Sequence, residues 1–78
     1  MDGLPVAFAL QGNRIVVANA NGVEPLESGD ELVLIDNQPV QGMTLEQVQG
    51  LVAGSKGSMI SLELKRPDGA VQLATPRE

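Results

Sequence analysis

The side chains that could perform catalysis in this 78-residue chain are hydroxyls and carboxylates, because the chain has neither His nor Cys. Without His, it lacks the group that most often transfers protons near neutral pH and the commonest metal ligand. No Gly-x-Ser-x-Gly elbow, Ser–Lys dyad spacing, Asp-Thr/Ser-Gly signature or Gly-x-Gly phosphate loop surrounds the hydroxyls of Ser28, Thr44, Ser55, Ser58, Ser61 and Thr75. We therefore predict that the chain by itself is not an enzyme. The alternative is a small catalytic protein, which hydrolytic activity of the isolated domain above the blank would support.

The acidic residues are a second candidate for chemistry, as a cation site. Several of them lie in the first half of the chain, at Asp2, Glu24, Glu27, Asp30 and Glu31. Their spacing matches no calcium-binding loop, so we interpret them as a solvated acidic face. We expect no metal and no cofactor.

Charge and hydropathy limit the partners further. The formal net charge is −5, and the five basic residues are scattered, so nucleic acid and anionic membranes are poor partners. No apolar run approaches the roughly 20 residues of a membrane span. No signal peptide is visible, and the chain passes directly from Met1 into a strand-like pattern. We expect a single domain over residues 1–78, cut from a larger protein.

The elements that would position a site are mostly strands. Apolar residues alternate with alanines over 6–10, and a turn signal then leads to a β-branched run at 14–18, so a hairpin is predicted. Further strands are expected at 31–35, 58–65 and 70–75, with a short edge strand at 39–40. With a single aromatic residue, Phe8, the core must consist of aliphatic side chains.

One helix is predicted, at about 45–53. Thr44 is its expected N-cap, and Gln47 completes a capping box. Gly54 is at the position of a left-handed C-cap, and Gly50 within the helix would be explained by close approach of another backbone. The apolar face of the helix comprises Leu45, Val48, Leu51 and Val52. The fold class is therefore mainly β (α+β), with five to six strands in a small, partly open barrel or sandwich capped by one main helix.

Three segments in sequence resemble PDZ domains. Residues 28–40, SGDELVLIDNQPV, are similar to the central PDZ signature; residues 42–48, GMTLEQV, resemble the start of the ligand-groove helix. Residues 57–66, GSMISLELKR, resemble the strand that follows this helix. A start near the carboxylate-binding loop and an extra final strand resemble the circularly permuted PDZ domains of bacterial and organelle proteases. The turn before the helix is most similar to the C-terminal-processing group. Only this resemblance favours the bacterial periplasm or cell envelope as the compartment.

The resemblance implies a peptide-binding site. In such domains an extended peptide joins the edge of a strand beside a helix, and loop N–H groups receive its terminal carboxylate. The implied loop and strand residues are Gly3, Leu4, Pro5, Val6, Ala7 and Phe8, and the helix residues are Leu45, Gln49 and Val52. Leu45 implies a preference for an apolar residue two places before the end of the ligand.

Pro5 departs from the resembled pattern, because it has no N–H to donate to a carboxylate. Two interpretations therefore stay open. The first is a module that binds apolar C-terminal tails, for substrate recognition or regulation in an attached protease. The alternative is a degenerate groove that docks against internal segments of the parent protein or an oligomer. The apolar site residues could equally be plain core residues, and Gly29–Asp30 is expected to be structural, with Gly29 permitting a turn and Asp30 accepting N–H bonds.

Overall fold

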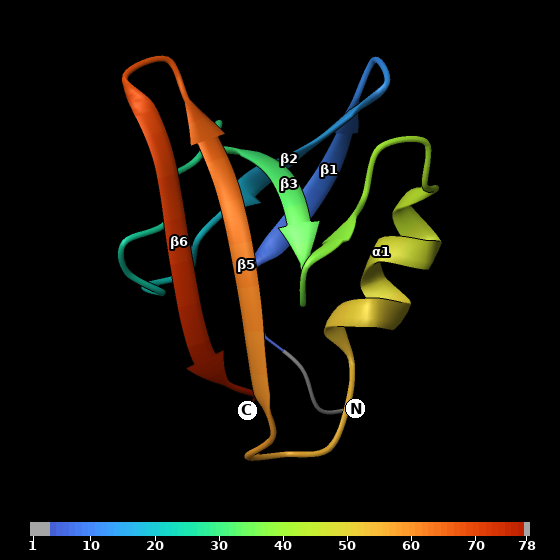
Figure 1. The fold of residues 1–78 in the computed structure, drawn as a ribbon, viewed down its shortest axis with the longest axis vertical. Coiled ribbons are helices and arrows are strands. Elements are labelled where there is room, and N and C mark those ends of the chain that lie inside the picture. Colours follow the sequence, from blue (N-terminus) through green and yellow to red (C-terminus); the bar gives the residue numbers. More distant parts are fainter. Residues whose placement is uncertain (1–3, 78) are drawn as a thin grey trace.

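The computed structural model describes residues 4–77. Within them, six strands form one sheet and a single helix covers part of it (Figure 1). In chain order the elements are β1 (Ala7–Gln11), β2 (Arg14–Asn19), β3 (Glu31–Ile35), β4 (Gln38–Pro39), α1 (Leu45–Val52), β5 (Met59–Arg66) and β6 (Gly69–Pro76). The mainly β architecture with one helix, predicted from the sequence, is confirmed, and the sheet remains open.

The sheet is antiparallel throughout, in the order β1-β2-β3-β5-β6, and β4 also pairs with β3. Short turns fix most of the register. Gly12, with φ 63°, allows the tight connection between β1 and β2. Asp36 and Asn37 both have positive φ, of 48° and 66°, the conformation of a type I′ hairpin turn between β3 and β4. This turn places the short strand at Gln38–Pro39, one residue before the predicted 39–40.

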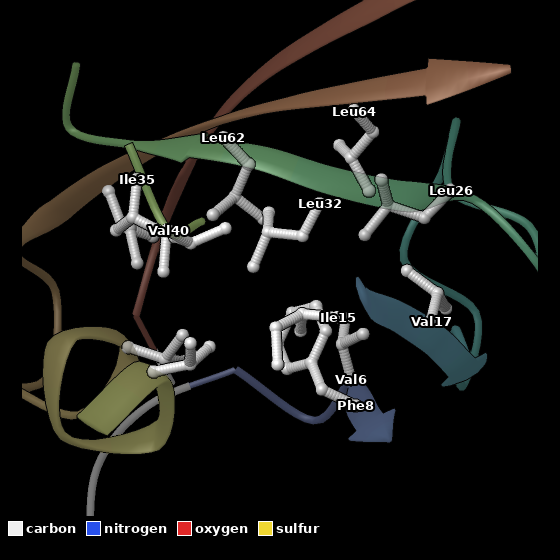
Figure 2. Packing of buried hydrophobic residues seen from close by; sticks show 13 residues of the cluster. Val6, Phe8, Ile15, Val17, Leu26, Leu32, Ile35, Val40, Leu62 and Leu64 are labelled. Atoms are coloured by element: carbon white, nitrogen blue, oxygen red, sulfur yellow. The ribbon is translucent and has the colours of Figure 1, made fainter. Parts of the chain in front are cut away.

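The hydrophobic core lies between the sheet and α1, and Figure 2 shows side chains from β1, β2, β3 and β5 that point into it. Ile35, Ile60, Leu64, Val17 and Val48 are fully buried. On β5 the alternation of Ile60, Leu62 and Leu64 is the predicted period-two pattern, with all three side chains buried. An aliphatic core of this kind explains why a single aromatic residue, Phe8, is sufficient.

The start of α1 follows the sequence prediction, and its end does not. The Gln47 N–H donates to Thr44 Oγ1 at 3.1 Å, and the Thr44 N–H donates to Gln47 Oε1 at 2.9 Å, which completes the capping box. The left-handed cap predicted at Gly54 is wrong: the helix ends at Ala53 in an extended conformation, with φ −68° and ψ 150°.

Gly50 also has a different environment from the one expected. No atom outside the helix lies within 4 Å of the position a Cβ would occupy there. The close backbone approach proposed for Gly50 is therefore absent, and this residue is an exposed helical glycine. Nothing in the structure explains why glycine occurs there.

Candidate functional site

β1 presents an unpaired edge. Among the strands of residues 4–77, it pairs with β2 alone. Val17 of β2, opposite Phe8, donates its N–H to Asp30 O and accepts from Gly29 N, both at 2.8 Å. Both of its polar groups thus point away from β1, which makes Phe8–Val17 a non-hydrogen-bonded pair. The N–H and C=O of Phe8 consequently point toward the free edge of β1.

The side chains of this segment divide between core and solvent. Val6 and Phe8 are buried and point into the core in Figure 2, where they lie near Ile15 and Leu32. Ala7 between them is exposed. Phe8 therefore holds β1 to the core through its ring while its backbone polar groups stay available at the edge.

Helix α1 packs against β1 and presents a mixed surface. Val52 is buried in the core, Leu45 is half-buried against it, and Gln49 is exposed. Because Leu45 retains partial exposure at the first turn, it is the apolar helix residue of the predicted site that a ligand could still contact. Val6, Phe8 and Val52 are already occupied in core packing.

The loop before β1 is anchored by an asparagine. The side-chain amide of Asn21 donates to the Pro5 carbonyl, and Asn19 Oδ1 accepts from the Asn21 N–H at 2.9 Å. Leu4 is half-buried against the core and Pro5 is exposed. Gly3, the first predicted loop residue, lies outside the described residues. Pro5, which has no N–H to donate, is thus tied through its carbonyl to the connection between β2 and β3.

Arg77 was missed by the sequence reasoning, although it supports the helix of the site. Its guanidinium donates to the carbonyls of Val52 (2.8 Å) and Leu51 (3.1 Å) at the end of α1. It also donates to Met59 O at 3.1 Å and Ser58 Oγ at 3.0 Å. A cation at this end compensates the helix dipole and satisfies carbonyls that have no partner within the helix. Only the basic character of a residue just beyond the last strand could have indicated this role.

Gly29 and Asp30 have the structural role expected from the sequence. Gly29 has φ 94°, and Asp30 Oδ2 accepts from the Glu27 N–H at 3.0 Å. Asp30 is buried, with 4% exposure, and forms a two-bonded ion pair with Arg66, at 2.7 and 2.9 Å. This hydrogen-bonded pairing holds the pKa of Asp30 below its ordinary value. The pair ties the β2–β3 connection to the end of β5.

Two further observations concern partners. Among residues 4–77, no three acidic side chains come close enough together to hold a metal ion. In the same part of the chain, α1 is too short to cross a membrane.

Comparison with known proteins identifies the fold. No family model matches the chain, and no curated protein matches it. Solved structures do match, and two of them define the class as a PDZ fold. The photosystem II D1 C-terminal processing protease superposes with a TM-score of 0.90 at 24% identity, over 99% of this chain. The PDZ domain of the carboxy-terminal protease from Vibrio cholerae, solved in complex with peptide, superposes with a TM-score of 0.86 at 20% identity, over 100% of this chain.

The particular fold is thus that of the PDZ domain of C-terminal processing proteases, as the sequence resemblance predicted. The chain corresponds to 94% of the isolated Vibrio cholerae domain but to only 23% of the D1 processing protease chain.

Proposed function

We propose that this chain is a peptide-binding module that adds an extended, apolar-ending peptide to the free edge of β1, beside α1. The observation that carries the proposal is the outward orientation of the Phe8 N–H and C=O on a strand whose other edge is paired. A peptide strand there would satisfy those groups by sheet extension. The half-buried Leu45 supports selection of an apolar side chain.

The attachment to a protease is part of the same proposal. The D1 processing protease contains this fold as about a quarter of its chain, and the Vibrio cholerae domain was crystallised with a peptide. A module of this kind would present substrate tails to an attached catalytic domain or regulate it. A catalytic domain encoded beside this segment in the complete reading frame is the expected finding.

A second function, docking of internal segments, is favoured by Pro5. A hydrogen bond to a charged group contributes about 1.5–3 kcal/mol, so loss of one donor weakens carboxylate capture by roughly ten- to a hundredfold. The Pro5 carbonyl accepts a hydrogen bond from the Asn21 side chain, which supports this position of Pro5. A site with this loop would depend more on strand addition and less on a free C-terminus.

NMR titration with two peptides separates these functions. Both peptides end in the same apolar residues, one with a free carboxylate and one with a C-terminal amide. Binding should shift the amide signals of Leu4 and of residues 6–10 and 45–52 at concentrations up to about 1 mM. Preference for the free acid supports capture of C-terminal tails, whereas equal affinities support internal segments. Absence of shifts with both peptides would refute the proposed site.

Pro5→Gly tests the loop directly, because it restores an N–H at this position. We expect it to strengthen binding of the free-acid peptide by roughly ten- to a hundredfold and to leave the amidated peptide unchanged. Pro67→Gly, in the exposed turn between β5 and β6, is the matched control and should change neither affinity.

A further inference from the structure

The second free edge of the sheet, along β6, differs from β1 in length and chemistry. β6 runs for eight residues, Gly69–Pro76, carries no charged side chain, and pairs without interruption with β5. No other strand of residues 4–77 pairs with it. Soluble proteins usually protect such edges with charges, bulges or short strands. On β6 the only protective feature is Pro76, at its last position.

The hydrogen bonds of Arg77, just after the last residue of β6, show which N–H and C=O groups of this strand point toward β5. The Arg77 N–H donates to Ser58 O, and Arg77 O accepts from the Gly57 N–H, both at 2.8 Å. Arg77 therefore directs its polar groups toward the β5 side. Because this direction alternates along a strand and the register with β5 is unbroken, Ala70, Gln72 and Ala74 direct their N–H and C=O groups outward.

These outward groups are self-complementary. In an antiparallel pair of two β6 strands centred on Gln72, Ala70 of one copy lies opposite Ala74 of the other, and the two Gln72 residues face each other. Every outward N–H of these three residues then meets an outward C=O. On the core side of the sheet, the half-buried Val71 of one copy comes to lie beside the half-buried Leu73 of the other.

Charge does not oppose this arrangement, despite the net charge of −5. The carboxylate nearest the pairing axis is Glu63, opposite Gln72 on β5, and its Oε1 accepts from Gln72 Nε2 at 2.9 Å. In the paired sheet, three strand spacings, roughly 14 Å, would separate the two Glu63 residues. That exceeds the Debye length of about 8 Å at physiological ionic strength.

We propose that β6 is a self-association surface, through which a second copy of this chain pairs antiparallel about Gln72 and continues the sheet. The partner is a second copy because β6 carries no charge that its twofold image would repel, and because the half-buried Val71 and Leu73 meet across the axis. This surface is separate from the free edge of β1, so the proposal does not depend on peptide binding.

Analytical ultracentrifugation of the 78-residue chain, up to about 1 mM, tests the proposal. The weight-average mass should rise with concentration from 8.2 kDa toward twice that value. Across the same series, concentration-dependent NMR shifts should concentrate at the amides of Ala70, Gln72 and Ala74. A mass that stays at 8.2 kDa, or shifts located elsewhere, would overturn the proposal.

Gln72→Lys places two like charges opposite each other on the axis, and should weaken association by roughly tenfold or more. Within one chain the new Lys faces Glu63, which favours the fold. Gln41→Lys, at an exposed position after β4, makes the same charge change away from β6 and should associate like the parent chain. Ala74→Pro removes one outward N–H without removing a β5–β6 bond, and should also weaken association. Equal association of all four chains would refute pairing through β6.

Discussion

Gly54 lies against the side chain of Arg77. The effect of Gly54→Ala on the free energy of unfolding should therefore have opposite signs in the presence and in the absence of that side chain. A Cβ added at Gly54 would lie 2.8 Å from Arg77 Nε and 3.0 Å from its Cδ and Cζ. The φ of Gly54 is not in the left-handed region, so alanine is compatible with the backbone itself. Gly54→Ala should therefore be unfavourable only because Arg77 occupies the space.

The magnitudes follow from the contacts of Arg77. Its side chain is 10% exposed and makes four hydrogen bonds, to Leu51, Val52, Ser58 and Met59. At about 0.5–1.5 kcal/mol for each of the four bonds, Arg77→Ala should cost about 2–6 kcal/mol. Gly54→Ala should cost about 1–3 kcal/mol in the parent chain, by displacing this guanidinium. In the Arg77→Ala background it should instead stabilise by about 0.4–1 kcal/mol, by restricting the unfolded chain.

Urea denaturation of the parent, both single variants and the double variant gives the coupling energy, expected to be about 1.5–4 kcal/mol. In thermal unfolding, each kcal/mol corresponds to about 4–8 °C in a domain of this size. Gly50→Ala is the matched control: its Cβ would meet no atom outside the helix, so it should stabilise both backgrounds by up to about 1 kcal/mol. If Gly54→Ala stabilises both backgrounds equally, Arg77 does not hold the helix end as described.

Three further predictions concern stability. Arg66 lowers the pKa of Asp30, so this carboxylate stabilises the fold above its unfolded pKa of about 3.9, and the stabilisation should disappear as pH falls through the lower folded pKa. Urea midpoints measured from pH 7 to 2 should therefore fall less steeply in Asp30→Asn than in the parent chain. Parallel curves for the two chains would contradict this. Thr44→Ala removes the capping hydroxyl and should lower the free energy of unfolding by about 0.5–2 kcal/mol, whereas Thr44→Ser should retain most of it. Leu64→Ala, at a side chain with 0% exposure, should cost about 2–5 kcal/mol in urea denaturation, and a loss below 1 kcal/mol would contradict its place in the core.

Most of the fold could be predicted because its signals are local. The alternation on β5 and the Thr44–Gln47 capping box each depend on residues close together in the chain. The observed strand boundaries differ from the predictions by one residue at most ends, since the period-two pattern locates a strand better than it locates its ends. Gly54 was interpreted wrongly for the same local reason: a glycine after a helix usually indicates a left-handed cap.

The site could be predicted only in outline. The sequence placed Leu45 on the apolar face of the helix and Pro5 before the first strand. It could not show which apolar residues are buried in the core and therefore inaccessible to a ligand. Burial of Val6, Phe8 and Val52 depends on the packing of β1 against α1. The outward polar groups of Phe8 depend on the bonds that Val17 makes to the segment before β3.

The sequence by itself determined the period of each element, the helix start, the turn residues and the absence of His and Cys, because these are properties of single residues or near neighbours. Only the tertiary structure decided how the helix ends, which strands have free edges and which groups point outward from them. Arg77 donates to carbonyls 25 and 26 residues away in the chain, and Asp30 pairs with Arg66, which is 36 residues away. Contacts over such separations have no local pattern, because they form only when the sheet and α1 have packed together.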